Sequence, residues 1–296
     1  MKLRVRLVLT PWLVGVGVAA AQPPPDQPPP EPAPPSTTVP TPIPDAVPAP
    51  DEGYPRALVA RPLLLPSGAL EASVAGGAQV SDFGDESVEL YSVEPRVKVG
   101  VGGAELELAS TLVMNTEQTI GDITITTERW ARAFAAGRIG IAPETSLGVE
   151  LTMFAPTADN PAYQGRAVIA HKAHLAAQSA VELSGFAGAL RTTFTAADGD
   201  TTTTTVQLGG QLRAQAQIAP LVGIEGRAQL AYFNRTGDSM LDPIFGAGEG
   251  LAQDYGIRLV GSIAPELDAF GGVDFLGVGS TDVKLFTVGV AYRRVP

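Results

Sequence analysis

Residues 204–218, TTVQLGGQLRAQAQI, alternate between apolar and polar side chains. Val206 and Leu212 fall on one face of an extended chain, and Gln211 and Arg213 fall on the other. This period of two predicts a β-strand. The run is 15 residues long, whereas an ordinary strand has about five or six. It is therefore long enough for a tilted strand to cross a bilayer.

A short turn ends this run and recurs along the chain. Ile-Ala-Pro stands at 141–143, 218–220 and 263–265, each time between two alternating runs. Gly102-Gly103 and the region around Gln178 make two further tight turns. The other connections are longer and rich in Asp, Asn, Thr and Gly. Tight turns on one side and long polar loops on the other are typical of a transmembrane β-barrel.

The whole pattern predicts an all-β protein with a single antiparallel transmembrane β-barrel of about 12 strands. An even number of strands puts the first and last strand ends on the short-turn side. A soluble sandwich or a lipocalin-like barrel also alternates, and this alternative stays open. The expected strands are 69–80, 89–101, 104–113, 129–141, 145–154, 164–175, 179–192, 204–218, 221–233, 253–263, 267–277 and 283–294.

The chain divides into three parts. Residues 1–21 are expected to be a signal peptide, since basic residues precede a short apolar run and three alanines. Residues 22–56 are so rich in proline that they predict a disordered, extended periplasmic linker. Residues 57–296 are expected to form the barrel.

Composition excludes several classes of protein. The chain has no cysteine, which rules out disulfides and thiol chemistry. After the signal, no run of about 18 apolar residues predicts a transmembrane helix. A net charge of −11 argues against a nucleic-acid partner. No cofactor and no metal site are expected, and nothing in the sequence defines the oligomeric state.

The polar faces of the strands are predicted to line the barrel interior. Charges of both signs at this density must be hydrated or paired, because an isolated buried ion is too costly. A hydrated lumen would be a narrow channel with weak ion selectivity, whereas a fully paired one would be a closed barrel. The pore-lining candidates are Arg96, Lys98, Glu107, Arg132, Arg138, Glu150, Gln211, Arg213, Glu225, Arg227, Gln229 and Arg258.

Enzymatic and metal-binding alternatives have little support. His171 and His174 lie three apart on one predicted strand, so they face opposite sides. Ser179 and Ser184 are near in sequence, but no spacing marks an activated nucleophile. The acidic pairs around Asp82 and at 198–200 are interpreted as solvated turns. The longest loop, 234–252, could fold inward and narrow the pore.

Aromatic residues lie near the ends of the expected strands. This is where the two interfacial girdles of a membrane barrel are found. The residues assigned to the girdles are Tyr91, Trp130, Phe154, Tyr163, Phe194, Tyr232, Phe233, Tyr255 and Tyr292.

The segment RPLLLPSGAL at 61–70 resembles the start of uncharacterised Gram-negative barrels that carry R-P-L-x-L-P-x-G. The last strand, LFTVGVAY at 285–292, is similar to the C-terminal signal read by the barrel-assembly machinery. The chain thus resembles the bacterial outer-membrane β-barrel superfamily, which includes the porins. This resemblance implies a location in the cell outer membrane, with membrane lipid and the assembly machinery as partners and the linker in the periplasm.

The sequence therefore predicts a non-enzymatic outer-membrane barrel that forms a narrow, low-selectivity channel for small solutes. A non-transporting barrel is the alternative, acting as a membrane anchor or a scaffold whose loops or linker bind a partner. A barrel-type lipid hydrolase comes third.

Overall fold

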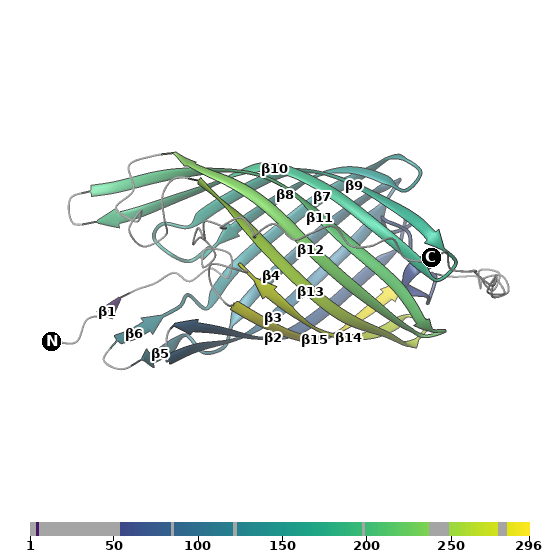
Figure 1. Cartoon of the computed structure of the whole chain (residues 1–296), viewed down its shortest axis with the longest axis horizontal. Coiled ribbons are helices and arrows are strands. Elements are labelled where there is room, and N and C mark those ends of the chain that lie inside the picture. Colours follow the sequence, from purple (N-terminus) through teal and green to yellow (C-terminus); the bar gives the residue numbers. More distant parts are fainter. Residues whose placement is uncertain are drawn as a thin grey trace, which may run out of the picture.

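The computed structural model describes residues 4–5, 54–83, 86–120, 123–196, 199–236, 249–277 and 283–296. Within these residues, twelve antiparallel strands close into a barrel (Figure 1), which confirms the predicted fold class. Two shorter strands, β5 and β6, lie in the connection between β4 and β7. The elements are β1 (Arg4–Val5), η1 (Leu58–Ala60), β2 (Leu70–Phe83), β3 (Glu86–Val101), β4 (Ala104–Val113), β5 (Glu117–Ile120), β6 (Ile123–Thr126), β7 (Trp130–Ala142), β8 (Thr145–Phe154), β9 (Ala162–Ala176), β10 (Ser179–Ala196), β11 (Gly199–Ala219), β12 (Val222–Thr236), β13 (Glu249–Ala264), β14 (Leu267–Leu276) and β15 (Val283–Arg294).

Each barrel strand pairs with the next barrel strand along the chain, and β15 pairs with β2 to close the ring. This arrangement follows from the hairpins, because a tight turn brings two consecutive strands into antiparallel register. The turn at Gly102-Gly103 has positive φ at both glycines, and Glu144 has a φ of 55° in the next short turn. The short turns gather at one end of the barrel, near the C-terminus (Figure 1).

The barrel is apolar outside and polar inside. Outward side chains such as Leu108, Leu208 and Val288 are 61–68% exposed. Inward Glu107 and Lys172 are each only 4% exposed. A water-soluble fold buries apolar side chains and exposes charges, so this distribution fits a barrel surrounded by lipid. Among the described residues, no helix has the length and hydropathy needed to cross a membrane.

Several expected loops are partly strands. β2 and β3 continue through most of 81–87, and β10 and β11 continue through most of 196–203. The β-branched run Thr201–Thr205 favours extended chain, which explains the second extension. The connection between the expected strands 104–113 and 129–141 contains the β5–β6 hairpin, which forms a small sheet with β1.

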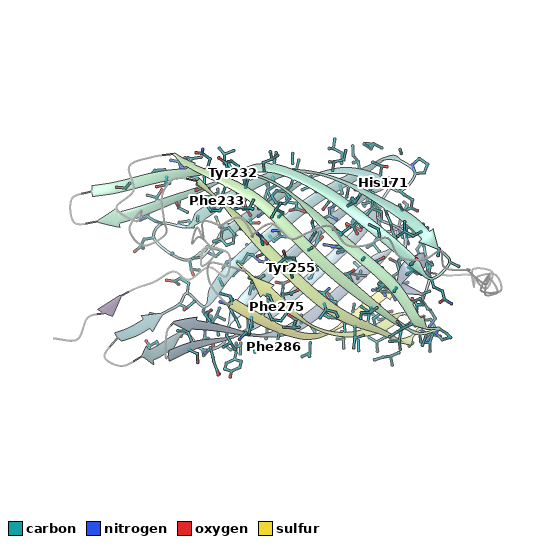
Figure 2. The ribbon with its side chains drawn as sticks, viewed as in Figure 1. His171, Tyr232, Phe233, Tyr255, Phe275 and Phe286 are labelled. Atoms are coloured by element: carbon teal, nitrogen blue, oxygen red, sulfur yellow. The ribbon has the colours of Figure 1, made fainter. Side chains whose placement is uncertain are left out.

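The predicted aromatic girdles are partly wrong. Six of the named residues are exposed on the outer surface: Tyr91, Trp130, Tyr163, Tyr232, Tyr255 and Tyr292. Phe275 and Phe286 join them on this surface (Figure 2). Phe154 and Phe233, however, are only 2% and 7% exposed. They share strand parity with the inward residues Thr152 and Gln229, so they point into the barrel.

The interior contains apolar side chains that the alternation pattern did not indicate. Phe154 packs with Ala162 and Leu190, and a second buried cluster contains Val88, Leu90, Val113 and Ala131. The predicted signal peptide, apart from β1, and nearly all of the linker lie outside the described residues. So do the long loop at 237–248 and the side chain of Phe194.

Candidate functional site: the barrel lumen

The lumen contains a cavity of about 550 Å³ that extends along most of the barrel wall. Period-two alternation on the long strands turns every second side chain toward it. The structure puts all twelve pore-lining candidates on this wall: Arg96, Lys98, Glu107, Arg132, Arg138, Glu150, Gln211, Arg213, Glu225, Arg227, Gln229 and Arg258. Their role in solute passage stays a prediction.

One part of the lumen wall is a connected ion-pair network on the adjacent strands β3, β4 and β7. Arg96 Nη2 lies 2.7 Å from Glu94 Oε1, and Arg96 Nη1 lies 2.5 Å from Glu107 Oε1. Arg132 also pairs with Glu94, and Lys98 lies 4.0 Å from Glu107. Glu94 and Glu107 therefore each contact two cations, which offsets much of their desolvation.

Further ion pairs lie elsewhere on the lumen wall, two between adjacent strands and one across the intervening strand β13. Arg138 lies 3.0 Å from Glu150, Arg213 lies 3.7 Å from Glu182, and Arg227 lies 2.8 Å from Asp274. Glutamines extend the network, because Gln215 donates to Glu225 at 3.0 Å and Gln229 donates to Asp254 at 3.1 Å.

Two lumen arginines are stabilised differently. Arg166 stacks over the Phe186 ring at 4.8 Å from its centroid, and Arg258 stacks over Phe270 at 5.2 Å. Within the described part of the chain, neither makes an ion pair. Cation–π contact keeps a guanidinium flat against the wall, so its charge remains available to whatever enters the lumen.

Arg213 lines the lumen on β11. In the ring of twelve strands, β11 lies opposite β3 and β4. Arg96 and Glu107 line the lumen on that opposite wall. Charges of both signs therefore stand on the two facing walls.

Inward glycines let long side chains lie along the wall. A Cβ added at Gly256 would stand 1.9 Å from Asp274 Oδ1 and 2.9 Å from Arg227 Nε. The Arg227–Asp274 ion pair thus occupies the space that a side chain on the strand between them would fill. Gly188 plays the same part for Arg166, since a Cβ there would stand 2.9 Å from Arg166 Cγ.

We expect Gly256→Ala to lower the free energy of unfolding by about 1–3 kcal/mol, because the ion pair must move out of its groove. Gly226→Ala on β12 is the matched control, since a Cβ there meets no atom within 4 Å. Its effect should stay within about 0.5 kcal/mol. Urea titration of the protein in lipid vesicles measures both variants. Equal effects would contradict this account of the wall.

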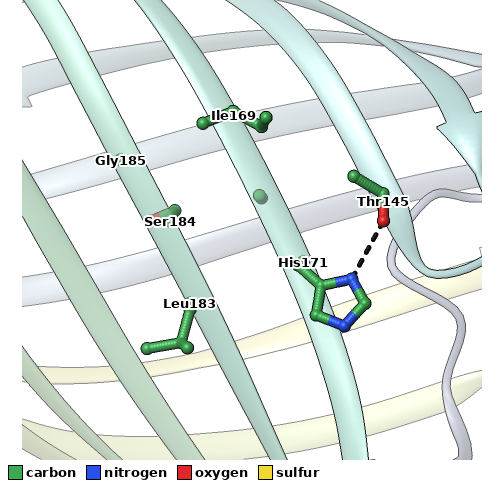
Figure 3. Close-up of a pocket in the computed structure, with 7 residues that line it drawn as sticks. Thr145, Ile169, His171, Leu183, Ser184 and Gly185 are labelled. Atoms are coloured by element: carbon green, nitrogen blue, oxygen red, sulfur yellow. Dashed lines mark hydrogen bonds between the residues drawn. The ribbon is translucent and has the colours of Figure 1, made fainter.

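The two histidines do not form a catalytic arrangement with the nearby serines. His171 faces outward, beside Leu183 and Ile169 (Figure 3), and its Nδ1 lies 2.9 Å from Thr145 Oγ1. His174 faces inward and bonds to the carbonyl oxygen of Val59 at 3.0 Å. Ser184 pairs with Ala170, one position away from the His171 pair with Leu183, so its side chain points to the opposite face. In the described ranges, no group of three or more His, Cys, Asp or Glu side chains could hold a metal ion.

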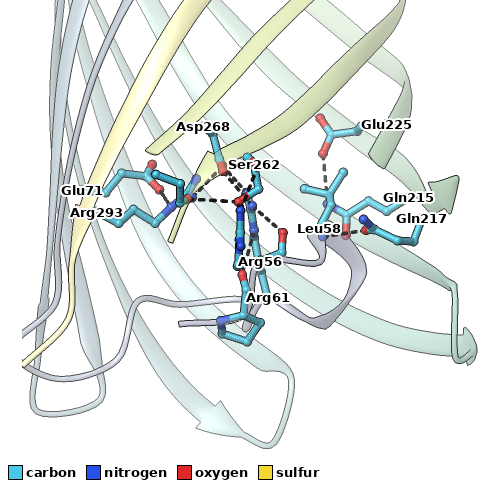
Figure 4. Close-up of polar contacts among 12 residues, drawn as sticks. Arg56, Leu58, Arg61, Glu71, Gln215, Gln217, Glu225, Ser262, Asp268 and Arg293 are labelled. Carbon is cyan, nitrogen blue, oxygen red and sulfur yellow. Dashed lines mark hydrogen bonds and ion pairs between the residues drawn. The ribbon is translucent and has the colours of Figure 1, made fainter. Parts of the chain in front are cut away.

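Sequence reasoning missed the segment Tyr54–Ala69, here called the mouth segment. It precedes β2 and contacts the short-turn ends of strands around the ring (Figure 4). Leu58, Val59 and Leu65 in this segment are all less than 9% exposed. Burial raises the pKa of Tyr54 to about 12. The phenol therefore stays neutral, and Arg293 lies 5.2 Å from its ring centroid.

Comparison with known proteins shows which solved structures have a similar fold. No family model matches the chain, and no curated protein matches it. The NanC porin matches with a TM-score of 0.51 and 11% identity, over 75% of this chain and 98% of the porin. The COG4313 outer membrane channel from Pseudomonas putida F1 matches with a TM-score of 0.48 and 13% identity, over 78% of this chain and 97% of the channel. At such low identity the likeness to the porin speaks for architecture, and the chain has the fold of the outer-membrane β-barrel proteins.

Proposed function

We propose that this protein is an outer-membrane channel that lets small polar solutes cross through a narrow lumen of low selectivity. The observation that carries the proposal is the cavity of about 550 Å³ with a charged lining, inside a barrel whose outer surface is apolar. The NanC porin has a similar barrel fold. The short-turn end would face the periplasm, where a linker at 22–56 would also lie.

Weak selectivity follows from the charges on the facing walls of the lumen. Arg96 pairs with Glu107 on one wall, and Arg213 pairs with Glu182 on the other. A permeating cation and a permeating anion would each meet attractive and repulsive groups at the same depth. A mixed lining discriminates poorly between the two signs of charge.

A closed barrel that serves as an anchor or scaffold is the second candidate. The dense pairing of the lumen charges and the mouth segment across one end both favour it. Planar-bilayer recording separates the two candidates. Discrete conductance steps would support the channel. Absence of conductance in the mature chain and in every variant described below would overturn it in favour of the scaffold.

Charge removal on the lumen wall should change the ion selectivity. We expect the mature protein to give a reversal potential near zero in a potassium chloride gradient. Arg213→Gln removes a positive charge beside Glu182 and should favour cations by roughly two- to fivefold. Arg294→Gln makes the same chemical change on an exposed side chain next to the inward Arg293, and it should leave the reversal potential unchanged. If both variants shift equally, Arg213 does not line the permeation path.

A further inference from the structure

The mouth segment is attached to almost every side of the barrel at the short-turn end. Its partners come from strands far apart in the ring, so the segment crosses the opening and does not follow one wall. These partners are Gly100 on β3, Glu105 on β4, Lys172 and His174 on β9, Gln217 on β11, Gly223 on β12, Ser262 on β13, Asp268 on β14 and Arg293 on β15.

Backbone groups of the mouth segment are bonded by wall side chains. Leu58 N donates to Gln217 Oε1 at 2.8 Å, and Leu65 N donates to Glu105 Oε2 at 3.0 Å. Lys172 Nζ donates to the Arg61 carbonyl oxygen at 2.5 Å. The mouth segment is irregular, so its buried backbone N–H and C=O groups would have no hydrogen-bond partner without these bonds.

Arg61 links the segment to the wall through a buried ion pair. Its Nη1 lies 2.6 Å from Asp268 Oδ2, and its Nη2 also donates to the Arg56 carbonyl oxygen at 2.9 Å. Both side chains of the ion pair are less than 10% exposed. The Arg61 guanidinium thus contacts both the barrel wall and the backbone of the mouth segment (Figure 4).

The wall remains paired if Arg61 leaves. Asp268 also lies 2.6 Å from Arg293 Nη1, and Arg293 contacts Glu71 Oε2 at 2.5 Å. The freed Gln217, Lys172 and His174 stand at the rim, where water can bond to them. The barrel can therefore satisfy its polar groups with the segment docked or withdrawn, which is what a two-state element requires.

We propose that Tyr54–Ala69 is a gate that closes the periplasmic mouth of the lumen, with Arg61–Asp268 as its latch. This inference rests on the proposed channel function. With the gate docked, the segment lies across the short-turn end of the lumen. Withdrawal of the segment opens that end and completes the path.

The latch is tested by recording the Arg61→Gln variant in planar bilayers. All proteins in this experiment are made as the mature chain. Loss of a charge-assisted contact should raise the ratio of open to closed time roughly tenfold. Arg294→Gln is the matched control, because it removes an exposed arginine at the same end of the barrel. Its open probability should equal that of the unaltered protein. Equal open probability for Arg61→Gln and the unaltered protein would overturn the latch.

A reversible disulfide crosslink tests the gate itself. The chain has no cysteine of its own, so only the introduced cysteines can react. Leu58 Cβ lies 2.8 Å from the position of a Cβ at Gly223, so Leu58→Cys with Gly223→Cys can form a disulfide after the segment backs off by about 1 Å. Oxidation should abolish conductance, and reduction should restore it in the same membrane. Gly223→Cys alone should be insensitive to oxidation.

The outcomes separate the two proposals. If every protein conducts, and neither Arg61→Gln nor oxidation of the double-cysteine protein changes the conductance, the channel proposal stands and the gate proposal is overturned. Conductance missing from Arg61→Gln, from the reduced double-cysteine protein and from the unaltered chain overturns the channel, and the gate falls with it.

Discussion

Leu212→Arg is expected to lower the free energy of unfolding in lipid by about 2–4 kcal/mol, the cost of a lipid-facing arginine deep in the bilayer. Leu212 is 41% exposed on β11, well away from both ends of the strand. Its cross-strand partner Leu183 is 57% exposed on the same face. The new guanidinium would therefore stand in hydrocarbon without a counter-charge.

Gln211→Arg is the matched control, because residue 211 is the adjacent position on β11 and lines the lumen. There the same side chain meets water and carboxylates, and its effect should stay within about 0.5 kcal/mol. Urea titration in vesicles, followed by the fluorescence of Trp130, measures both. Equal losses for the two variants would refute the assignment of the faces.

Asp268→Ala is expected to lower the free energy of unfolding by about 3–5 kcal/mol, because it leaves two buried cations without their shared partner. Asp268 is 2% exposed and lies 2.6 Å from both Arg61 and Arg293. Of these, Arg293 keeps Glu71, whereas the described residues offer Arg61 no second carboxylate.

Glu266→Ala serves as the control for Asp268→Ala. Glu266 is exposed in the short turn two residues earlier, so its removal should change stability by less than about 0.5 kcal/mol. The same urea titration applies. A small effect of Asp268→Ala would mean that the buried network contributes little and that the mouth segment is held by other contacts.

Strand positions were highly predictable from local pattern. The expected strands 104–113 and 145–154 match β4 and β8 to the residue. Polar loops were less predictable: β11 begins at Gly199 and not at the expected residue 204, because its pairing with β10 continues that far. The sequence pattern shows where side chains stop alternating between apolar and polar. Backbone hydrogen bonding between two strands can continue beyond that point, where both faces of the strands are hydrated.

Residue parity also identified the lumen-facing residues, since neighbours on a strand cannot share a face. It could not say which carboxylate each arginine meets. Arg227 bonds across Gly256 to Asp274, and this pairing depends on the register of three strands. The apolar interior cluster at Phe154 was missed because the inward face was assumed to be polar throughout.

By itself, the sequence determined a barrel with about twelve strands, the positions of those strands and the two faces, because these follow from period-two alternation and turn chemistry within each hairpin. Only the tertiary structure decided that the mouth segment lies across the short-turn end of the barrel. Val59 and Arg61 meet partners on β9 and β14, more than a hundred residues away in the chain. Those contacts exist only after the ring has closed, and no local pattern in residues 54–69 encodes them.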